Sequence, residues 1–169
     1  MPRIWLSLGS NQAREASLRG AVRMLRESFG PLILSGVYES EAVGFAGEPF
    51  LNLVAGADTD RPVEDVQRRL REIEDAHGRV RGGPKFGPRT LDIDLLAYGA
   101  VVRPELGLPR AEILHHAFVL GPLADVAPDE RHPVLGRSYA ALWAAFDRAA
   151  QPLRPVELDW DGRPDAGTG

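Results

Sequence analysis

The chain has 169 residues, of which 44% are hydrophobic and 26% charged, and its formal net charge is −4. This length suffices for one hydrophobic core and is short for two, so we expect a single domain over residues 1–160 and a disordered, glycine-rich tail over residues 161–169. The negative charge argues against a general nucleic-acid binder, no apolar run could cross a bilayer, and the lack of cysteine and of a visible secretory leader favours a cytoplasmic protein.

The first half of the chain alternates between strand and helix patterns. Three segments have the apolar pattern of strands, namely residues 4–8, 32–43 and 50–57. Apolar residues at helical spacing predict two helices, the first ending at Gly30-Pro31 and the second beginning near Pro62 and capped by Gly78. Within the second strand, an irregularity is expected near Gly36.

The second half begins with a fourth strand over residues 91–96, which Gly99 is expected to turn toward a short partner strand at Val101-Val102. Residues 118–123 are apolar and expected to be buried, and residues 139–149 have a helical pattern. The order strand, helix, strand, strand, helix, strand predicts an α+β fold. In this fold an antiparallel sheet carries helices packed on one face.

Positive charge is concentrated between the second helix and the fourth strand. Residues 77–91 contain no acid, and their glycines and prolines predict a loop. The cations of this loop are Arg79, Arg81, Lys85 and Arg89. Because a guanidinium group binds phosphate oxygens bidentately, the loop indicates a polyphosphate site.

Two aspartates follow this loop in the fourth strand. Because side chains alternate faces along a strand, Asp92 and Asp94 share one face at a spacing of roughly 6.5–7 Å, while Ile93 and its apolar neighbours face the core. Mg²⁺ prefers oxygen ligands and is usually held by one or two carboxylates together with substrate phosphates. The pair therefore indicates a magnesium-phosphate site with room for two ions. The alternative is an edge strand whose two acids face water.

Five motifs occur along the chain in the order found in one enzyme family. They are Leu8-Gly9-Ser10-Asn11, Phe50-Leu51-Asn52, Gly78-Arg79-Val80-Arg81, Gly87-Pro88-Arg89-Thr90-Leu91-Asp92-Ile93-Asp94 and Phe118-Val119-Leu120. Together they closely resemble the 6-hydroxymethyl-7,8-dihydropterin pyrophosphokinases of the folate pathway, from the first strand to about residue 148. The resemblance implies a ferredoxin-like sandwich, with a mainly antiparallel sheet and helices packed on its faces.

The resemblance also implies the reaction. The terminal pyrophosphoryl group of ATP would move to the hydroxymethyl oxygen of a reduced pterin, with release of AMP. Asp92 and Asp94 match the family's magnesium ligands, and two ions are expected with ATP bound. Arg81 and Arg89 match catalytic cations that grip the triphosphate. The further residues expected at the nucleotide are Glu74, Arg79, Lys85 and Arg110, and Glu74 by itself reads as an acid on an exposed helix face.

On the pterin side, the resemblance assigns Asn52 to the edge of the ring and Phe118 to stacking on its face. The other residues expected to line this pocket are Ser40, Val43 and Gly44. Taken singly, Phe118 would be a core residue and Asn52 a turn or edge feature, and only their joint occurrence in family order favours binding. Residues 9–11 are open between a plain turn and the floor of the pocket.

Three positions depart from the family pattern. Arg110 stands where the family usually has a histidine, His116 where it commonly has an arginine, and Phe86 where it often has a tryptophan. Arginine still binds phosphate and protonated histidine still donates, so nucleotide binding is expected to survive, whereas the accepted alcohol can differ. The neighbouring His115 and His116 could suggest a metal site, but no further ligand is apparent.

Other functions stay open on the sequence alone. The chain could be a paralogue that pyrophosphorylates another small alcohol, or a protein that binds nucleotide or pterin without chemistry. An RNA-binding module of the same fold is less favoured, because neither a positive face nor exposed sheet aromatics can be found. We expect ATP and a reduced hydroxymethylpterin as partners, with no nucleic acid and no membrane, and the sequence indicates no protein partner.

Overall fold

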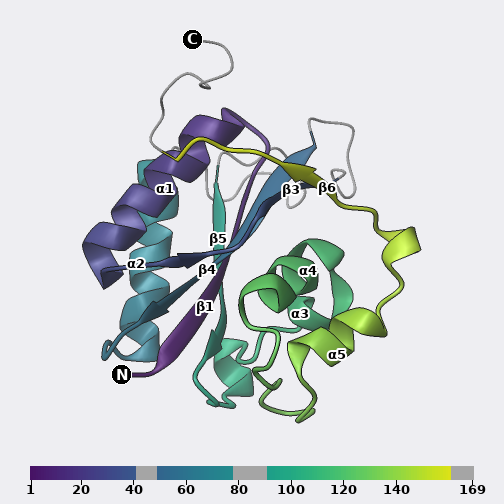
Figure 1. Ribbon diagram of the computed structural model, residues 1–169. Helices are drawn as coiled ribbons and strands as arrows, with labels where there is room; N and C mark the ends of the chain where they lie inside the picture. The colour runs from purple at the N-terminus through teal and green to yellow at the C-terminus, as the bar shows by residue number, and fades with distance from the viewer. Residues whose placement is uncertain (41–48, 78–90, 161–169) are drawn as a thin grey trace.

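One antiparallel sheet forms the centre of the computed structural model, which describes residues 1–40, 49–77 and 91–160 (Figure 1). Its six strands in these ranges are β1 (Arg3–Ser10), β2 (Ile33–Leu34), β3 (Val37–Ser40), β4 (Phe50–Asp58), β5 (Asp92–Tyr98) and β6 (Arg154–Val156). They lie in the order β5-β1-β4-β3-β6, and β2 pairs with β4. The long strands β1 and β4 therefore form the middle of the sheet, and β5 is an edge strand.

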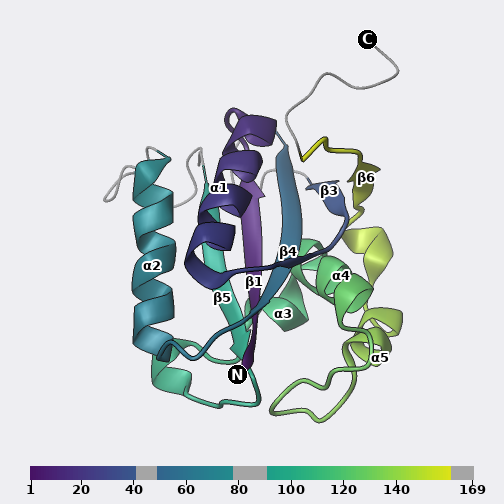
Figure 2. The ribbon, with the colours of Figure 1, turned by 60° about the vertical axis from the view of Figure 1, so that its left-hand side comes forward.

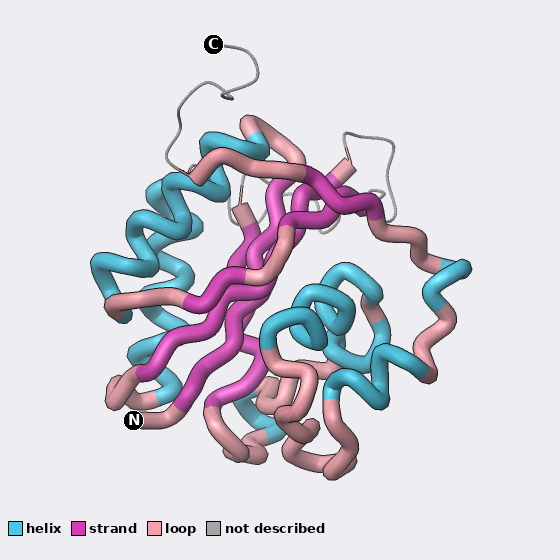
Figure 3. The backbone as a smooth tube through the Cα atoms, in the orientation of Figure 1, coloured by secondary structure: helices cyan, strands magenta, loops and turns pink. Residues whose placement is uncertain are grey.

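Helices cover both faces of this sheet (Figure 2). One face carries α1 (Arg14–Phe29) and α2 (Val63–Ala76), and the other carries α3 (Glu112–His115), α4 (Ala117–Val126) and α5 (Tyr139–Ala144). Single 3₁₀ turns span Pro104–Leu106 and Arg148–Ala150. Figure 3 shows the strands as one twisted layer between the two groups of helices. The predicted α+β fold, with an antiparallel sheet and helices packed on its faces, is confirmed.

The second helical layer is larger than the strand and helix pattern indicated. The apolar segment 118–123 is buried as predicted, and it forms most of α4. Seven of the ten residues of this helix are buried, and they lie on nearly all of its sides, so its sequence shows no helical periodicity. Since helical periodicity was missing from this segment, the sequence pattern predicted helices on only one face of the sheet.

Each face of the sheet has its own hydrophobic cluster in the described part of the chain. Ile4, Leu6 and Leu8 of β1 point toward α1 and α2, whereas Trp5 of the same strand points toward α4 and α5. This alternation is the expected period of two for a strand that is covered on both sides. The layer of α3, α4 and α5 thus covers the Trp5 side of the sheet.

The second predicted strand is divided into β2 and β3, which confirms the irregularity expected near Gly36. Ser35 accounts for the break, because its N–H donates to the Val54 carbonyl at 2.9 Å while its hydroxyl accepts the Val54 N–H at 2.8 Å. A side chain thereby replaces one backbone partner of the ladder. Its continuation over residues 41–43 lies outside the described residues.

The predicted partner strand at Val101-Val102 is wrong. Gly99 has φ +54° and turns the chain as expected, but the Val101 N–H bonds to the Tyr98 carbonyl and closes a tight turn. An isolated bridge between Arg103 and Leu108 follows instead of a strand. The Val101 N–H is therefore used in a turn and is not available for hydrogen bonding to a neighbouring strand.

The C-terminal segment differs from its prediction in two ways. The helix expected over 139–149 ends at Ala144, and the sequence analysis missed β6, which pairs with β3 at the edge of the sheet. Pro155 stands within β6, and proline is tolerated only in such edge strands. The C-cap residue of α2 is His77. The predicted cap, Gly78, and the tail over residues 161–169 lie outside the described residues. No helix in the described ranges is both long and apolar enough to span a bilayer.

Candidate active site

A row of register partners crosses four strands at one end of the sheet. From β5 to β3 its members are Asp92, Gly9, Asn52 and Tyr38. Register partners project to the same face of a sheet, so these side chains share one face. Since adjacent strands are about 4.8 Å apart, Asp92 and Asn52 are separated by about 10 Å, with only a glycine between them.

The next row along the strands contains Asp94, Ser7 and Val54. Val54 belongs to the cluster beneath α4, which identifies the face as the one covered by α3, α4 and α5. Asp92 and Asp94 are both half-buried there, while Ile93 between them is buried on the opposite face. The two carboxylates therefore have the shared face that the sequence predicted.

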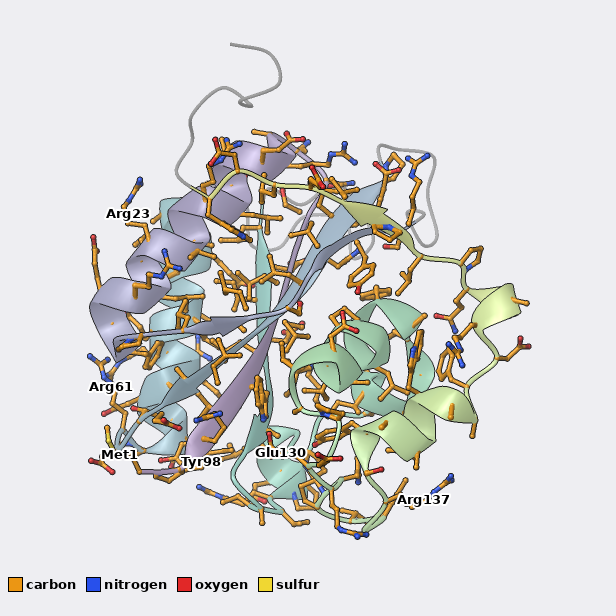
Figure 4. All side chains as sticks on the ribbon, viewed as in Figure 1. Met1, Arg23, Arg61, Tyr98, Glu130 and Arg137 are labelled. Atoms are coloured by element: carbon orange, nitrogen blue, oxygen red, sulfur yellow. The ribbon has the colours of Figure 1, made fainter. Side chains whose placement is uncertain are left out.

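These rows lie where β1 ends and β5 begins. Figure 4 shows Met1, Tyr98 and Glu130 at the other end of the sheet, where β1 begins and β5 ends. It also shows Arg23 and Arg137 extending outward from the periphery of the molecule. The polar row thus lies at the opposite end of the sheet from Met1, Tyr98 and Glu130.

Glu74 of α2 fixes the backbone between the two aspartates. Glu74 is 7% exposed, and its Oε2 accepts a hydrogen bond from the Ile93 N–H at 2.9 Å. Because β5 is an edge strand, this amide faces away from β1 and needs a partner outside the sheet. The expectation that Glu74 lies on an exposed helix face is wrong. It continues the apolar spacing of Val66 and Leu70, which would have placed it on the buried face of α2.

Arg110 lies beside the second aspartate. Its Nη2 is 3.4 Å from Asp94 Oδ1, and its Nε is paired with the Glu112 carboxylate. The backbone N–H of Arg110 donates to the Leu96 carbonyl at 2.9 Å, which ties this segment to β5 two residues beyond Asp94. One guanidinium group is therefore shared between two carboxylates at the edge of the sheet.

Asn52 is held in a single orientation. It is 4% exposed, and its Nδ2 donates to Ser40 Oγ at 2.8 Å and to the Tyr38 carbonyl at 3.2 Å. A Cβ on Gly9 would stand 3.2 Å from Asn52 Oδ1, so the glycine leaves the amide oxygen its space. Gly9 thus lies between Asn52 and Asp92 on this face of the sheet.

The predicted stacking residue Phe118 lies in the first turn of α4. It is half-buried, packs against the cluster on this face of the sheet, and stacks on His116 with a centroid distance of 4.8 Å. Burial lowers the pKa of His116, which nearby Glu112 only partly opposes. His116 therefore carries less positive charge near pH 7 than an unperturbed histidine, and it does not supply the fixed charge of the arginine that the family commonly has there.

Sequence reasoning missed the contact that joins α4 to β3. The Tyr38 hydroxyl donates to the Asp125 carboxylate, and burial together with this hydrogen bond raises the pKa of Tyr38 to about 12. Asp125 follows Phe118 by seven residues, so both lie on the same side of α4. Tyr38 could have been placed on this face from the sequence, since it precedes Ser40 by two residues in a strand.

The oxygen chemistry of the two aspartates fits a magnesium ion. Both carboxylates are half-exposed on one face, and such a pair leaves the remaining positions to water and phosphate oxygens, as Mg²⁺ prefers. In the ranges that the structure describes, no group of three or more His, Cys, Asp or Glu side chains could hold a metal ion. The alternative of a metal at His115 and His116 thus finds no further ligand there.

The structure brings Ser40, Asn52, Asp92 and Asp94 onto one face of the sheet, with Glu74 behind β5 and Arg110 beside it. Phe118 is on the helix layer that covers this face. The remaining predicted residues lie outside the described ranges, namely Val43, Gly44, Arg79, Arg81, Lys85 and Arg89, as does Phe86.

Comparison with known proteins identifies the family of this chain. A sequence profile of 7,8-dihydro-6-hydroxymethylpterin-pyrophosphokinase (HPPK) matches residues 5–128. The chain belongs to the HPPK family. The matched range includes every described site residue from Gly9 to Asp125, and it ends before α5 and β6. The resemblance inferred from the five motifs is confirmed.

Named HPPK relatives cover most of the chain. A 2-amino-4-hydroxy-6-hydroxymethyldihydropteridine pyrophosphokinase from Pseudomonas aeruginosa is 39% identical over 155 residues, which is 85% of this chain and 91% of that protein. The enzyme of the same name from Methylorubrum extorquens is 41% identical over 135 residues, or 76% of this chain and 85% of the relative. A solved structure of Plasmodium falciparum HPPK-DHPS matches with a TM-score of 0.67 at 14% identity, covering 85% of this chain and 43% of that one. At that identity the structural match concerns the fold alone.

Proposed function

We propose that this protein transfers pyrophosphate from ATP to 6-hydroxymethyl-7,8-dihydropterin and releases AMP, as a step of folate biosynthesis. The observation that carries the proposal is the row in which Asp92 and Asn52 flank Gly9 on one sheet face. It puts carboxylates suited to a metal-bound triphosphate about 10 Å from an amide suited to a pterin edge. In the proposed complex, the hydroxymethyl group of a pterin bound at Asn52 would therefore point toward a triphosphate bound at the carboxylates. The proposal includes the cytoplasmic location expected from the sequence.

On the phosphate side, Asp92 and Asp94 would hold magnesium, and we propose two ions with ATP bound. Bound magnesium would neutralise phosphate oxygen charge and orient the triphosphate. Glu74 would hold the backbone between the two aspartates through its hydrogen bond with the Ile93 N–H. Arg110 is close enough to Asp94 to contact a phosphate bound there. We also propose that Arg81 and Arg89 grip the triphosphate as catalytic cations, and that Arg79 and Lys85 bind the nucleotide.

On the pterin side, Asn52 would bond the ring edge while Phe118 packs on its face. The Asn52 amide is already oriented by Ser40 and β3, so little ordering is needed when the ring binds. From the family resemblance we also assign Val43 and Gly44 to this proposed pocket. In the reaction, a bond forms between the hydroxymethyl oxygen and the β-phosphorus of ATP. The bond from the β-phosphorus to the oxygen of the α-phosphate breaks, and the hydroxyl proton is released.

The products decide this proposal. With ATP, Mg²⁺ and 6-hydroxymethyl-7,8-dihydropterin, mass spectrometry should detect AMP and the pterin diphosphate in equal amounts. Formation of ADP would overturn pyrophosphoryl transfer. AMP formed only with a different alcohol would identify the paralogue that the departures at Arg110 and His116 make conceivable, and magnesium-dependent ATP binding without AMP would identify a binding protein.

Phe118→Leu should raise the KM for the pterin about three- to tenfold and leave the KM for ATP unchanged. Leucine keeps apolar packing on α4 but removes the ring, and an aromatic contact contributes about 0.5–1.5 kcal/mol beyond its buried area. The matched control is Phe146→Leu, because Phe146 packs against the same cluster and stacks on Trp143. Steady-state kinetics with each substrate varied in turn measure the effect, and equal KM changes in both variants would exclude a stacking role.

A further inference from the structure

Arg110 makes two ion pairs and one backbone hydrogen bond close to Asp94. Its guanidinium group lies 3.4 Å from Asp94 and pairs with Glu112, while its backbone N–H bonds to Leu96. The side chains of Arg110 and Asp94 are 35% and 41% exposed, so water and small ions reach the pair. The contact is therefore of the weak, exchangeable kind that exposed ion pairs form.

The second carboxylate gives Arg110 somewhere to remain when it leaves the first. Glu112 begins α3 and pairs with the Nε edge of the guanidinium, whereas Asp94 faces its Nη2 edge. Loss of the Asp94 contact thus leaves Arg110 paired with Glu112 and frees its outer N–H groups. Those groups are the ones that bind phosphate oxygens bidentately.

We propose that Arg110 is an internal counter-ion of Asp94, which it leaves when a divalent cation takes that carboxylate, and that it then binds a phosphate of the nucleotide. The second half of this inference rests on the proposed function, whereas the first half concerns Asp94 and the cation alone. Arg110 therefore acts in opposite directions on two ligands. It weakens binding of the bare metal ion, with which it competes, and strengthens binding of the metal–nucleotide complex.

Arg103 supplies the matched comparison. It lies on the same connecting segment, is similarly exposed at 39%, and is also shared between two carboxylates, those of Glu64 and Glu105. Neither of these acids belongs to the polar rows of the sheet. Removing its charge changes the net charge of the protein by the same amount without touching Asp94.

The test uses Mn²⁺ alone and a non-hydrolysable ATP analogue with Mg²⁺, both with the full chain and without pterin. For Arg110→Gln, electron paramagnetic resonance titration should show Mn²⁺ binding about two- to fivefold tighter, the range expected for removal of an exposed ion pair. Calorimetry should show the Mg²⁺–analogue complex binding about tenfold more weakly, because a charge-assisted phosphate contact is lost. Arg103→Gln should change neither affinity by more than long-range charge effects.

The Mn²⁺ titrations decide whether Arg110 acts as a counter-ion of Asp94. Unchanged or weaker Mn²⁺ binding in Arg110→Gln would overturn the counter-ion role, as would the same increase in Arg103→Gln. In the background Asp94→Asn, Arg110→Gln should no longer affect Mn²⁺ affinity, and a persisting increase would also overturn the inference. Since neither titration measures turnover, absence of pterin diphosphate in the product assay would refute the proposed function while leaving the Mn²⁺ result to be judged separately.

Discussion

Asp94→Ala and Asp92→Ala are each expected to lower kcat about a thousandfold or more while the protein stays folded. A metal that neutralises phosphate charge contributes several kcal/mol to the transition state, and about 4 kcal/mol corresponds to a thousandfold change in rate. Both side chains are half-exposed, and the apolar face of β5 is untouched by the substitutions. The free energy of unfolding should therefore change by only about 0.5 kcal/mol. Rates of AMP formation and denaturant unfolding measure the two quantities.

Asp58→Ala is the control for these substitutions. Asp58 ends β4 at the opposite end of the sheet, where its carboxylate is paired with Arg3 at 2.5 Å. Its loss should leave AMP formation unchanged. Near-normal turnover in both Asp92→Ala and Asp94→Ala would remove the magnesium role from this strand, and unfolding of either variant would contradict the small stability change expected here.

The fold was predictable where local patterns decide it. Alternating apolar residues identified β1 and β5, because side chains have a period of two along a strand, and an apolar segment identified β4. The helix α4 carries apolar residues on almost every side, so its periodicity is lost and only its burial could be predicted. The three-residue strand β6 has no pattern of its own, and it exists because the edge of β3 offers free backbone groups.

The candidate site was predictable residue by residue and only partly as an arrangement. The shared face of Asp92 and Asp94 follows from their spacing within one strand. The approach of Asn52 to Asp92 depends on the register of both strands against Gly9, which no local pattern contains. The pairing of Arg110 with Asp94 is likewise a tertiary contact across sixteen residues. Such contacts depend on chain pairing, so they become visible only in the folded protein.

Glu74 is the site residue whose role changed most between sequence and structure, and its substitution is expected to affect both stability and rate. Glu74→Ala should lower the free energy of unfolding by about 1.5–3 kcal/mol, because a buried amide loses a charged hydrogen-bond acceptor. The kcat should fall as well, since the Ile93 amide lies between the two aspartates and a small displacement of reacting groups costs up to about a hundredfold. Chemical denaturation and steady-state rates of AMP formation measure both effects.

Two further variants separate the hydrogen bond from the charge and from the helix. Glu74→Gln keeps an acceptor oxygen for the Ile93 amide, so it should retain more of both stability and rate than Glu74→Ala. Glu72→Ala removes from the same helix an exposed acid that forms a 3.9 Å pair with Arg69, and should change stability by only about 0.5 kcal/mol. If Glu74→Ala proved no more damaging than Glu72→Ala, the Ile93 contact would not be what keeps the aspartate strand in place.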